Sequence, residues 1–558
     1  MKTCKQCSEQ FEIFAPDKAF YQKIGVPEPT LCPACRQQRR LAFRNERTLY
    51  NRTCDLCKKA IVAIYPAGTI FPVYCNECWW SDKWNALDYG IDYDPTRPFF
   101  DQFVEVRNRV PRISSLVMTS ENSEYTNNVG NLKNCYILFA AEDDEECMYG
   151  RLVHNSKNCV DCDNTHTCER CYGSIGLNNC YGALFSERCQ TCTDILFGFN
   201  LSGCSNCILC TNLRNKTYCI ENKQVTKEEY QKKFVEIMAS RETIDVARKR
   251  FNELKAQAIV KYADIIKSEN VTGDYLFGCR DTVYAFDTRE GRASGYTNDA
   301  LEPTDVYDSN NVYYKPELCY EVMGGLKVYD CKFSYYVFYS SDMLYSDSCH
   351  NMNSGIACVG VSKNDYCILN KKYDKDTFEK MKAEIIARLK REGIWGEFFP
   401  PALSVFAYNE TLGMSYFPIT KEEALKRGWH WTDTMPFTYG KETMRPDAVP
   451  KSIGEVKDDI IKEVLACAHC GRNYKITAQE LGFYRTSKIP LPALAPECRL
   501  LERMTRRNPR RLWKRQCMCN QTGHASHIGQ CANQFQTTYA PERKETVYCD
   551  TCYSAEVL

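Results

Sequence analysis

The sequence predicts a protein that is mainly β with helical segments, in which duplicated zinc-ribbon pairs at both termini flank two parallel β-solenoid (β-helix-like) segments with capping helices. Three observations predict this fold: paired CxxC motifs near both ends, short strand-like runs that recur with cysteines in the middle, and a charged helical stretch after each run. The 558 residues include 35 cysteines, and Lys+Arg (72) nearly cancels Asp+Glu (71). A hydrophobic fraction of 44% excludes wholesale disorder.

We expect six segments along the chain. They are residues 1–90 (tandem zinc-ribbon pair with a basic segment), 91–225 (cysteine-rich β-solenoid), 226–268 (helical cap or connector), 269–373 (second β-solenoid), 374–462 (helix and mixed linker) and 463–558 (second tandem zinc-ribbon pair with a basic segment).

The first segment carries four consecutive CxxC pairs. The eight cysteines are Cys4, Cys7, Cys32, Cys35, Cys54, Cys57, Cys75 and Cys78. Each CxxC turn places two thiolates on one ion and a hairpin brings a second pair opposite, so this spacing predicts two tetrahedral zinc ribbons. Closed four-sulfur sites leave no open coordination position, which predicts structural zinc.

The last segment repeats the first. At a constant offset of 463, Cys4, Cys7, Cys35 and Cys54 correspond to Cys467, Cys470, Cys498 and Cys517. Beyond an insertion the offset is 474, and Cys57, Cys75 and Cys78 correspond to Cys531, Cys549 and Cys552. We therefore expect a third and a fourth ribbon.

Two departures from the repeat affect its metal content. Ala495 stands at the position of Cys32, so the third ribbon is expected to be metal-free, weakened or completed by His469. The insertion adds Cys519, His524 and His527, and the fourth ribbon offers Cys517 or Cys519 with its other three cysteines. We interpret the two histidines as polar loop residues rather than ligands. The expectation is three to four structural zinc ions.

Both ribbon pairs contain an arginine-rich segment. The candidate nucleic-acid-binding residues are Arg36, Arg40, Arg44, Arg47 and Arg52 in the first pair, and Arg499, Arg503, Arg506, Arg507, Arg510, Arg511, Lys514 and Arg515 in the second. If the first segment is helical, one face carries Arg36, Arg39, Arg40, Arg44 and Arg47. Basic residues number 12 against 7 acidic ones in residues 1–80, and 14 against 8 in residues 463–558. Arginine forks bind phosphates bidentately, so the segments predict nucleic-acid binding; ion pairs with the acidic middle or with other acidic proteins are the alternatives.

The middle of the chain has recurrent cysteines preceded by a polar residue, as in Asn134-Cys135, Asn158-Cys159 and Asn179-Cys180. Steps of 9 or 12 residues between most of them, with period-two apolar runs, predict a parallel β-helix of roughly two strands per 20–24-residue rung. A buried thiol ladder is the expected role of these cysteines. Metal at Cys159-x2-Cys162, Cys168-x2-Cys171, Cys189-x2-Cys192 or Cys204-x2-Cys207 is the alternative. The second block, from Cys279 through Cys319 and Cys331 to Cys367, is expected to behave in the same way.

Charged helices follow both blocks. We expect one over residues 226–266, with Thr226 and Glu229 as a capping box, and one over 376–392. A short helix between Thr420 and Gly428 is expected in the linker, and we expect His430 to be packed.

Known catalytic signatures are missing from the sequence: there is no phosphate-cradling glycine loop, no HExxH and no GxSxG. Asp161, Asp163 and His166 form the nearest approach to a polar catalytic cluster. We leave enzymatic activity uncertain and favour its absence, and we expect no organic cofactor.

The terminal pattern joins CxxC, Phe-Tyr, Leu-Cys-Pro-x-Cys-Arg, an Arg/Asn-rich segment and Val-Tyr-Cys-x-x-Cys. It resembles uncharacterised bacterial multi-zinc-ribbon, cysteine-rich proteins, a resemblance that implies zinc and no established activity.

We therefore predict a non-enzymatic zinc-binding scaffold in the cytoplasm whose basic ends bind RNA, DNA or a nucleoprotein machine such as the ribosome. The alternatives are a self-assembling structural or protein-interaction module built on solenoid stacking, and a glycan-active β-helix enzyme. No stretch approaches the ~18 apolar residues of a membrane span, and no secretory signal is evident at the first residues.

Overall fold

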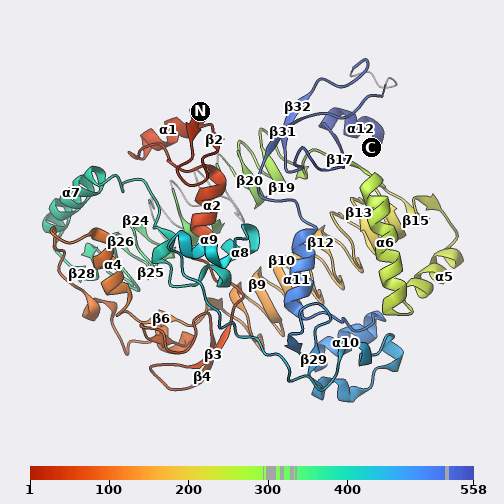
Figure 1. Cartoon of the computed structure of the whole chain (residues 1–558), viewed down its shortest axis with the longest axis horizontal. Helices are drawn as coiled ribbons and strands as arrows, with labels where there is room; N and C mark the ends of the chain where they lie inside the picture. Colours follow the sequence, from red (N-terminus) through yellow and green to blue (C-terminus); the bar gives the residue numbers. More distant parts are fainter. Residues whose placement is uncertain are drawn as a thin grey trace.

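The computed structural model describes residues 1–292, 295–296, 310–313, 320–326, 332, 336–521 and 527–557 (Figure 1). Within these residues helices and strands contribute about equally. The expectation of a mainly β protein was therefore wrong in its proportions, because the terminal modules and the connecting segments contain more helix than their cysteine motifs indicate.

The terminal modules, residues 1–90 and 463–558, contain the same elements in the same order. In the N-terminal module these are β1 (Lys2–Thr3), β2 (Gln10–Phe11), α1 (Ala15–Lys23), α2 (Pro33–Leu41), β3 (Tyr50–Thr53), β4 (Ala60–Ala63), β5 (Val73–Tyr74) and α3 (Asn76–Trp79). In the C-terminal module they are β29 (Leu465–Ala466), β30 (Asn473–Tyr474), α10 (Ala478–Ser487), α11 (Pro496–Thr505), β31 (Trp513–Gln516), β32 (Gln534–Thr537), β33 (Thr546–Tyr548) and α12 (Asp550–Val557). The offsets of 463 and 474 that relate the cysteines also relate these elements.

Parallel strands follow the N-terminal module and form the first ladder. They are β7 (Val117–Met118), β8 (Asn127–Gly130), β9 (Tyr136–Glu142), β10 (Met148–His154), β11 (Asp163–His166), β12 (Ile175–Asn178), β13 (Thr193–Phe199), β14 (Ser205–Thr211) and β15 (Thr217–Ile220). Paired residues are 12 apart, as in Tyr136 with Met148 and Ile195 with Cys207. The repeat of 20–24 residues expected from the sequence is therefore wrong, and one repeat takes 12.

The backbone of the first ladder repeats every three residues. From Thr119 to Glu221 every third residue has a positive φ, and many of these residues are Asn, Asp or Gly. Such residues adopt the left-handed conformation at the lowest cost. From Leu132 to Cys210 every third residue is also buried, and each follows directly after a left-handed one. The Asn-Cys pairs of the sequence are this unit: the asparagine turns the chain and the cysteine points inward.

A second ladder is also parallel, with paired residues 11 apart between Ile265 and Leu276, 13 apart between Asn310 and Met323, and 12 apart in its other strand pairs. Its strands are β18 (Ile265–Ile266), β19 (Gly273–Phe277), β20 (Ala285–Arg289), β21 (Asn310–Tyr313), β22 (Met323–Leu326), β23 (Val337–Phe338), β24 (Ser341–Leu344), β25 (Cys349–His350), β26 (Asn353–Ile356) and β27 (Cys367–Ile368). Val337 pairs with Cys349 and Gly355 with Cys367, again 12 residues apart. The predicted ladder cysteines Cys319 and Cys331 lie outside the described residues.

Each ladder is covered at both ends. At the start, β6 (Arg112–Ile113) pairs with β5 of the N-terminal module, and β17 (Ile259–Lys261) pairs with β33 of the C-terminal module. At the other end, the short antiparallel strands β16 (Lys223–Gln224) and β28 (Lys371–Lys372) close the ladders. Helices α5 (Lys227–Met238) and α6 (Arg241–Gln257) then pack on the first ladder, and α7 (Lys375–Arg391) follows the second (Figure 1).

The helical connectors differ from expectation in two places, the first being that helix α6 ends at Gln257 rather than at residue 266, and β17 and β18 follow instead. The region expected to be a single helix is split into α5 and α6, because Ser240 has an extended backbone and caps α6. The predicted capping box of Thr226 and Glu229 is confirmed. Asp374 caps α7.

The remaining segments contain α4 (Phe99–Arg107), α8 (Leu412–Tyr416) and α9 (Lys421–Lys426). Thr420 caps α9, as expected. His430 was expected to be packed but is exposed, and its ring lies 3.1 Å from the carbonyl oxygen of Ala402. Among the described residues, no helix combines the length and the apolar character needed to cross a membrane.

Candidate metal centres

Three groups of four thiols are brought together by the terminal modules. They are Cys4, Cys7, Cys32 and Cys35; Cys54, Cys57, Cys75 and Cys78; and Cys517, Cys531, Cys549 and Cys552, with all four sulfurs of each group within 4.8 Å of one another. Four sulfurs at ~2.3 Å from a zinc ion stand about 3.8 Å apart at the corners of a tetrahedron. The measured separations are 3.7 Å for Cys7–Cys32, 3.8 Å for Cys57–Cys75 and 4.0 Å for Cys531–Cys549. These groups fit structural zinc sites.

Backbone N–H groups of the facing helices point at the sulfurs. Cys32 donates to Cys4 Sγ at 3.3 Å, Cys75 to Cys54 Sγ at 3.3 Å and Cys549 to Cys517 Sγ at 3.2 Å. Such hydrogen bonds favour the thiolate, which is the form that binds zinc. At Cys54 burial raises the pKa, but backbone hydrogen bonds, first those from Cys57 and Cys75, outweigh it and lower the pKa to about 6.

The third ribbon holds three thiols, Cys467, Cys470 and Cys498. His469 is exposed and is not part of this group, so the structure does not bring it in as a fourth ligand. Ala495 nevertheless keeps the local geometry, since its N–H lies 3.2 Å from Cys467 Sγ in the manner of Cys32. The site lacks one sulfur and retains the fold of a complete one.

We expect Ala495→Cys to create a complete third zinc site, because the backbone at residue 495 already faces Cys467. The variant should bind one zinc ion per chain more tightly than the wild type, measured as the ion retained during dialysis against a chelator of graded strength. The matched Cys32→Ala variant should weaken one site of the first pair. Equal zinc retention by Ala495→Cys and the wild type would contradict the prediction.

The fourth ribbon uses Cys517 for its four-thiol group, which decides between the two predicted candidates. Cys519 lies instead with His527 and Cys552 in a second group of ligand atoms. His524 lies outside the described residues. The interpretation of His527 as a polar loop residue missed this placement, because the insertion has no counterpart in the second ribbon.

Most of the arginines named as candidates for nucleic-acid binding are buried. Arg36, Arg40, Arg44, Arg499, Arg503 and Arg510 are among the buried residues, while Arg47, Arg52, Arg506 and Arg507 are largely covered. Helix α2 also ends at Leu41 and α11 at Thr505, so the later arginines of each segment lie beyond the helix. Little of the guanidinium surface of these ten candidates is therefore open to a nucleic-acid backbone.

In the C-terminal module the buried arginines bind carboxylates of both ladders. Arg503 donates from Nε to Asp163 at 2.5 Å and from Nη1 to Asp161 at 2.7 Å. The Asp161–Asp163–His166 cluster considered for catalysis is thus in large part an acceptor for this arginine. Arg510 binds Asp287 of the second ladder at 2.6 Å, and Arg507 binds the same carboxylate. Together these two arginines outweigh the effect of burial and hold the pKa of Asp287 below its usual range.

The N-terminal module makes the corresponding contacts. Arg39 of α2 binds Glu321 of the second ladder at 2.5 Å and Glu397 at 2.6 Å. Glu46 of this module forms an ion pair with Arg151 of the first ladder, with 2.8 Å between Glu46 Oε2 and Arg151 Nε.

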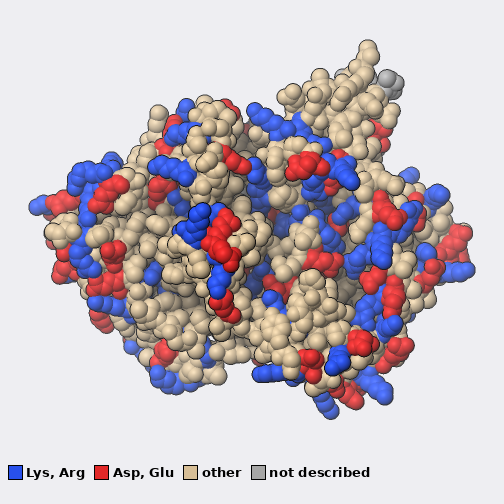
Figure 2. Space-filling view, viewed as in Figure 1, with Lys and Arg blue, Asp and Glu red and all other residues tan. Residues whose placement is uncertain are grey.

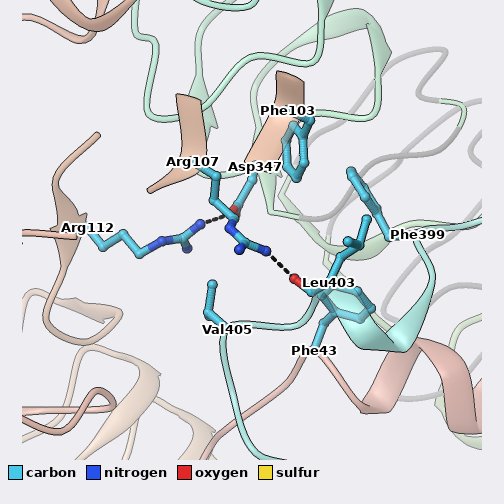
Figure 3. Close-up of a pocket in the computed structure, with 8 residues that line it drawn as sticks. All are labelled: Phe43, Phe103, Arg107, Arg112, Asp347, Phe399, Leu403 and Val405. Carbon is cyan, nitrogen blue, oxygen red and sulfur yellow. Dashed lines mark hydrogen bonds and ion pairs between the residues drawn. The ribbon is translucent and has the colours of Figure 1, made fainter. Parts of the chain in front are cut away.

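Strand β6 pairs with β5 of the N-terminal module and carries Arg112. Arg112 forms an ion pair with Asp347 of the second ladder, beside an enclosure lined by aromatic side chains (Figure 3). Arg107 in the same enclosure donates to the carbonyl oxygen of Leu403 (Figure 3). Sequence reasoning missed Arg112 because a single arginine between modules carries no motif.

The other three candidate basic residues are less covered. Arg511 is exposed and pairs with exposed Glu9 at 3.0 Å, Lys514 is exposed, and Arg515 is half-buried. On the face shown in Figure 2, acidic and basic side chains are interspersed.

The cysteines of the first ladder are buried, and their sulfurs contact backbone carbonyl oxygens, as in Cys147 with Glu145 at 3.5 Å. Among the described residues, the clusters of metal-ligating side chains all lie in the terminal modules and none includes a ladder cysteine.

Because the first ladder buries a histidine, we expect the free energy of unfolding to decrease in acid. His154 stacks on His166 with ring centres 4.9 Å apart. Burial, with Arg289 and Arg151 nearby, lowers the pKa of His154 to about 4. The folded state holds this ring neutral and the unfolded state protonates it below pH ~6.5, so stability falls as the pH drops from ~6.5 towards 4, by up to about 3 kcal/mol.

The measurement is urea unfolding of the wild type and of His154→Gln at pH 7.5 and pH 5. We expect the wild type to lose more stability than the variant across this interval. Zinc sites also weaken in acid, but equally in both proteins, so an identical loss would contradict the prediction.

Comparison with family models matches residues 1–44 to a family described as a probable treble clef domain. This match and the cysteine groups show a zinc-binding domain at the N-terminus. Neither the curated proteins nor the solved structures gave a match.

Proposed function

We propose that this protein is a non-enzymatic, zinc-stabilised scaffold in which each terminal module extends one ladder and clamps the other. The observation that carries the proposal is the reciprocal arrangement of the two modules. The C-terminal module pairs β33 with β17 at the start of the second ladder and inserts Arg503 of α11 between carboxylates of the first. The N-terminal module pairs β5 with β6 before the first ladder and binds Glu321 of the second through Arg39 of α2.

The ladders are best explained as four-sided solenoids. Each 12-residue repeat would have four sides of three residues, with one left-handed residue and one inward side chain per side. The 12-residue register and the period of three in both φ and burial support this interpretation. Small inward residues such as Cys, Ser, Ala and Gly suit so narrow a coil. The ladders would then be rigid spacers that fix the distance between the zinc modules.

Assembly by end-to-end stacking of the ladders has less support. Both ladders end on short strands, β16 and β28, with exposed lysines, and exposed lysines on an edge disfavour pairing with another chain. The opposite ends are already paired with the zinc modules.

Nucleic-acid binding is retained as a second candidate on a smaller surface. Arg511 and Lys514 are exposed, and the Arg511 guanidinium lies 5.2 Å from the ring centre of Trp513, an arrangement that suits contact with phosphate and a base. Filter binding of RNA and DNA at two salt concentrations tests it. Loss of binding in the double variant Arg511→Gln/Lys514→Gln would support nucleic-acid binding. Absence of salt-dependent binding by the wild type would refute it.

The clamp is tested by cutting the chain. A protease site inserted after the exposed Thr434 allows the C-terminal module to be cleaved from the rest of the full-length protein. We expect the cleaved module to co-elute with the ladders in gel filtration and to separate from them after zinc is removed. Separation while zinc is still bound would refute the clamp.

A further inference from the structure

We infer that the fourth ribbon holds two zinc ions, with Cys552 bridging them, and that Cys519 and His527 are ligands of the second ion. This deepens the zinc-binding role proposed above and rests on it. The sulfurs of Cys517, Cys531, Cys549 and Cys552 form the first site. The ligand atoms of Cys519, His527 and Cys552 also lie within 4.8 Å of one another, so Cys552 belongs to both groups.

The imidazole of His527 is oriented as a metal ligand. Its Nδ1 lies 2.7 Å from the carbonyl oxygen of Gly529, which fixes the proton on Nδ1 and leaves the lone pair on Nε2. Nε2 points at Cys552 Sγ from 3.3 Å. In a tetrahedral zinc site with Zn–N ~2.0 Å and Zn–S ~2.3 Å, nitrogen and sulfur stand about 3.5 Å apart, close to this separation.

The second sulfur of the site comes from Cys519. Both Cys519 and Cys552 are fully buried, although Cys519 is not needed to complete the four-thiol group. Thiolate and imidazole are the ligands that zinc prefers, and a thiolate sulfur keeps enough lone pairs to bind two ions. The geometry therefore gives the second ion three protein donors from the described residues.

The second ribbon provides a comparison within the same chain. At the offset of 463, Leu56 stands where the fourth ribbon has Cys519, and no insertion supplies a histidine. Leu56 packs against the apolar cluster of that ribbon. Cys78, the counterpart of Cys552, belongs to a single metal group. A leucine is thus compatible with this ribbon fold, which makes Cys519→Leu a conservative test.

The experiment measures zinc per chain in the full-length protein by elemental analysis after removal of loosely bound metal. We expect Cys519→Leu and His527→Gln each to lose one zinc ion relative to the wild type, and the double variant to lose the same single ion. Cys552→Ser should lose two ions, whereas the matched Cys78→Ser should lose one. Zinc-edge X-ray absorption should show a zinc–zinc distance in the wild type that is lost in Cys519→Leu.

Unchanged zinc content in both Cys519→Leu and His527→Gln would refute the presence of the second ion. Loss of one ion only in Cys552→Ser overturns the bridge. A wild-type chain that holds no zinc would refute the proposed scaffold itself, an outcome that these variants separate from failure of the second site alone. Circular dichroism of Cys519→Leu and His527→Gln, matched to the wild type, shows that loss of the second ion does not reflect a misfolded chain.

Discussion

Replacing Arg503 with methionine should destabilise the protein by about 3–5 kcal/mol, the cost of removing one partner from a buried ion pair. The side chain is 2% exposed and makes three contacts, with Asp163, Asp161 and the carbonyl oxygen of Tyr149 at 2.8 Å. Methionine fills much of the same volume but leaves buried Asp163 without its arginine and Asp161 with Arg499 as its remaining cation. Urea unfolding followed by tryptophan fluorescence measures the loss.

Two control variants separate this effect from a general effect of lost charge. Arg511→Met removes an exposed arginine from the same segment, whose pair with Glu9 lies at the surface, and should cost less than about 1 kcal/mol. Arg503→Lys keeps the charge but loses the bidentate fork, so its cost should fall between the two. Equal losses in Arg503→Met and Arg511→Met would contradict the clamp.

The metal groups were predictable from the sequence because their ligands are set by local spacing. A CxxC turn and a hairpin place four sulfurs together with little help from the rest of the fold, and the first two groups formed as this spacing indicates. The internal repeat predicted the third group, in which an insertion separates Cys517 from Cys531. Ala495 showed from the sequence alone that the third ribbon is incomplete. The unpredicted placement of His527 arose in the insertion, where the internal repeat gives no guide.

The role of the arginines was not predictable in the same way. The acidic partners of Arg503 lie some 340 residues earlier in the chain, and no periodicity connects them to α11. Ion pairing with the acidic middle was one of three possibilities for these residues. Only the packing of α11 onto the first ladder identifies ion pairing, among these three possibilities, as the role of Arg503.

The twelve-residue repeat was only partly predictable from the sequence. Its signal was visible as asparagine before cysteine, but the cysteine spacing alone predicted roughly two strands in each rung of 20–24 residues. The structure shows the pair as two of the three residues of a repeating unit, in which Asn158 is left-handed and Cys159 is buried. A search for left-handed formers at every third position would have found this period.

Disrupting the first ribbon should have the largest effect of any single change. We expect Cys35→Ser to release one zinc ion and to unfold the N-terminal module, because zinc binding to a small ribbon is itself folding free energy, of about 10–16 kcal/mol in isolated zinc fingers. Cys498→Ser removes the corresponding sulfur from the three-thiol ribbon and should release less zinc and cause a smaller loss. Elemental analysis gives the zinc lost, and hydrogen exchange locates the unfolding.

The expected pattern of exchange follows from the clamp. In Cys35→Ser the amides of α1 and α2 should lose protection, and with them those around Glu321, because Arg39 is then no longer held against that carboxylate. Protection around Asp161 and Asp163 should persist, since the C-terminal module supplies their arginine. Uniform loss of protection along both ladders would show that zinc stabilises the chain as one unit rather than module by module.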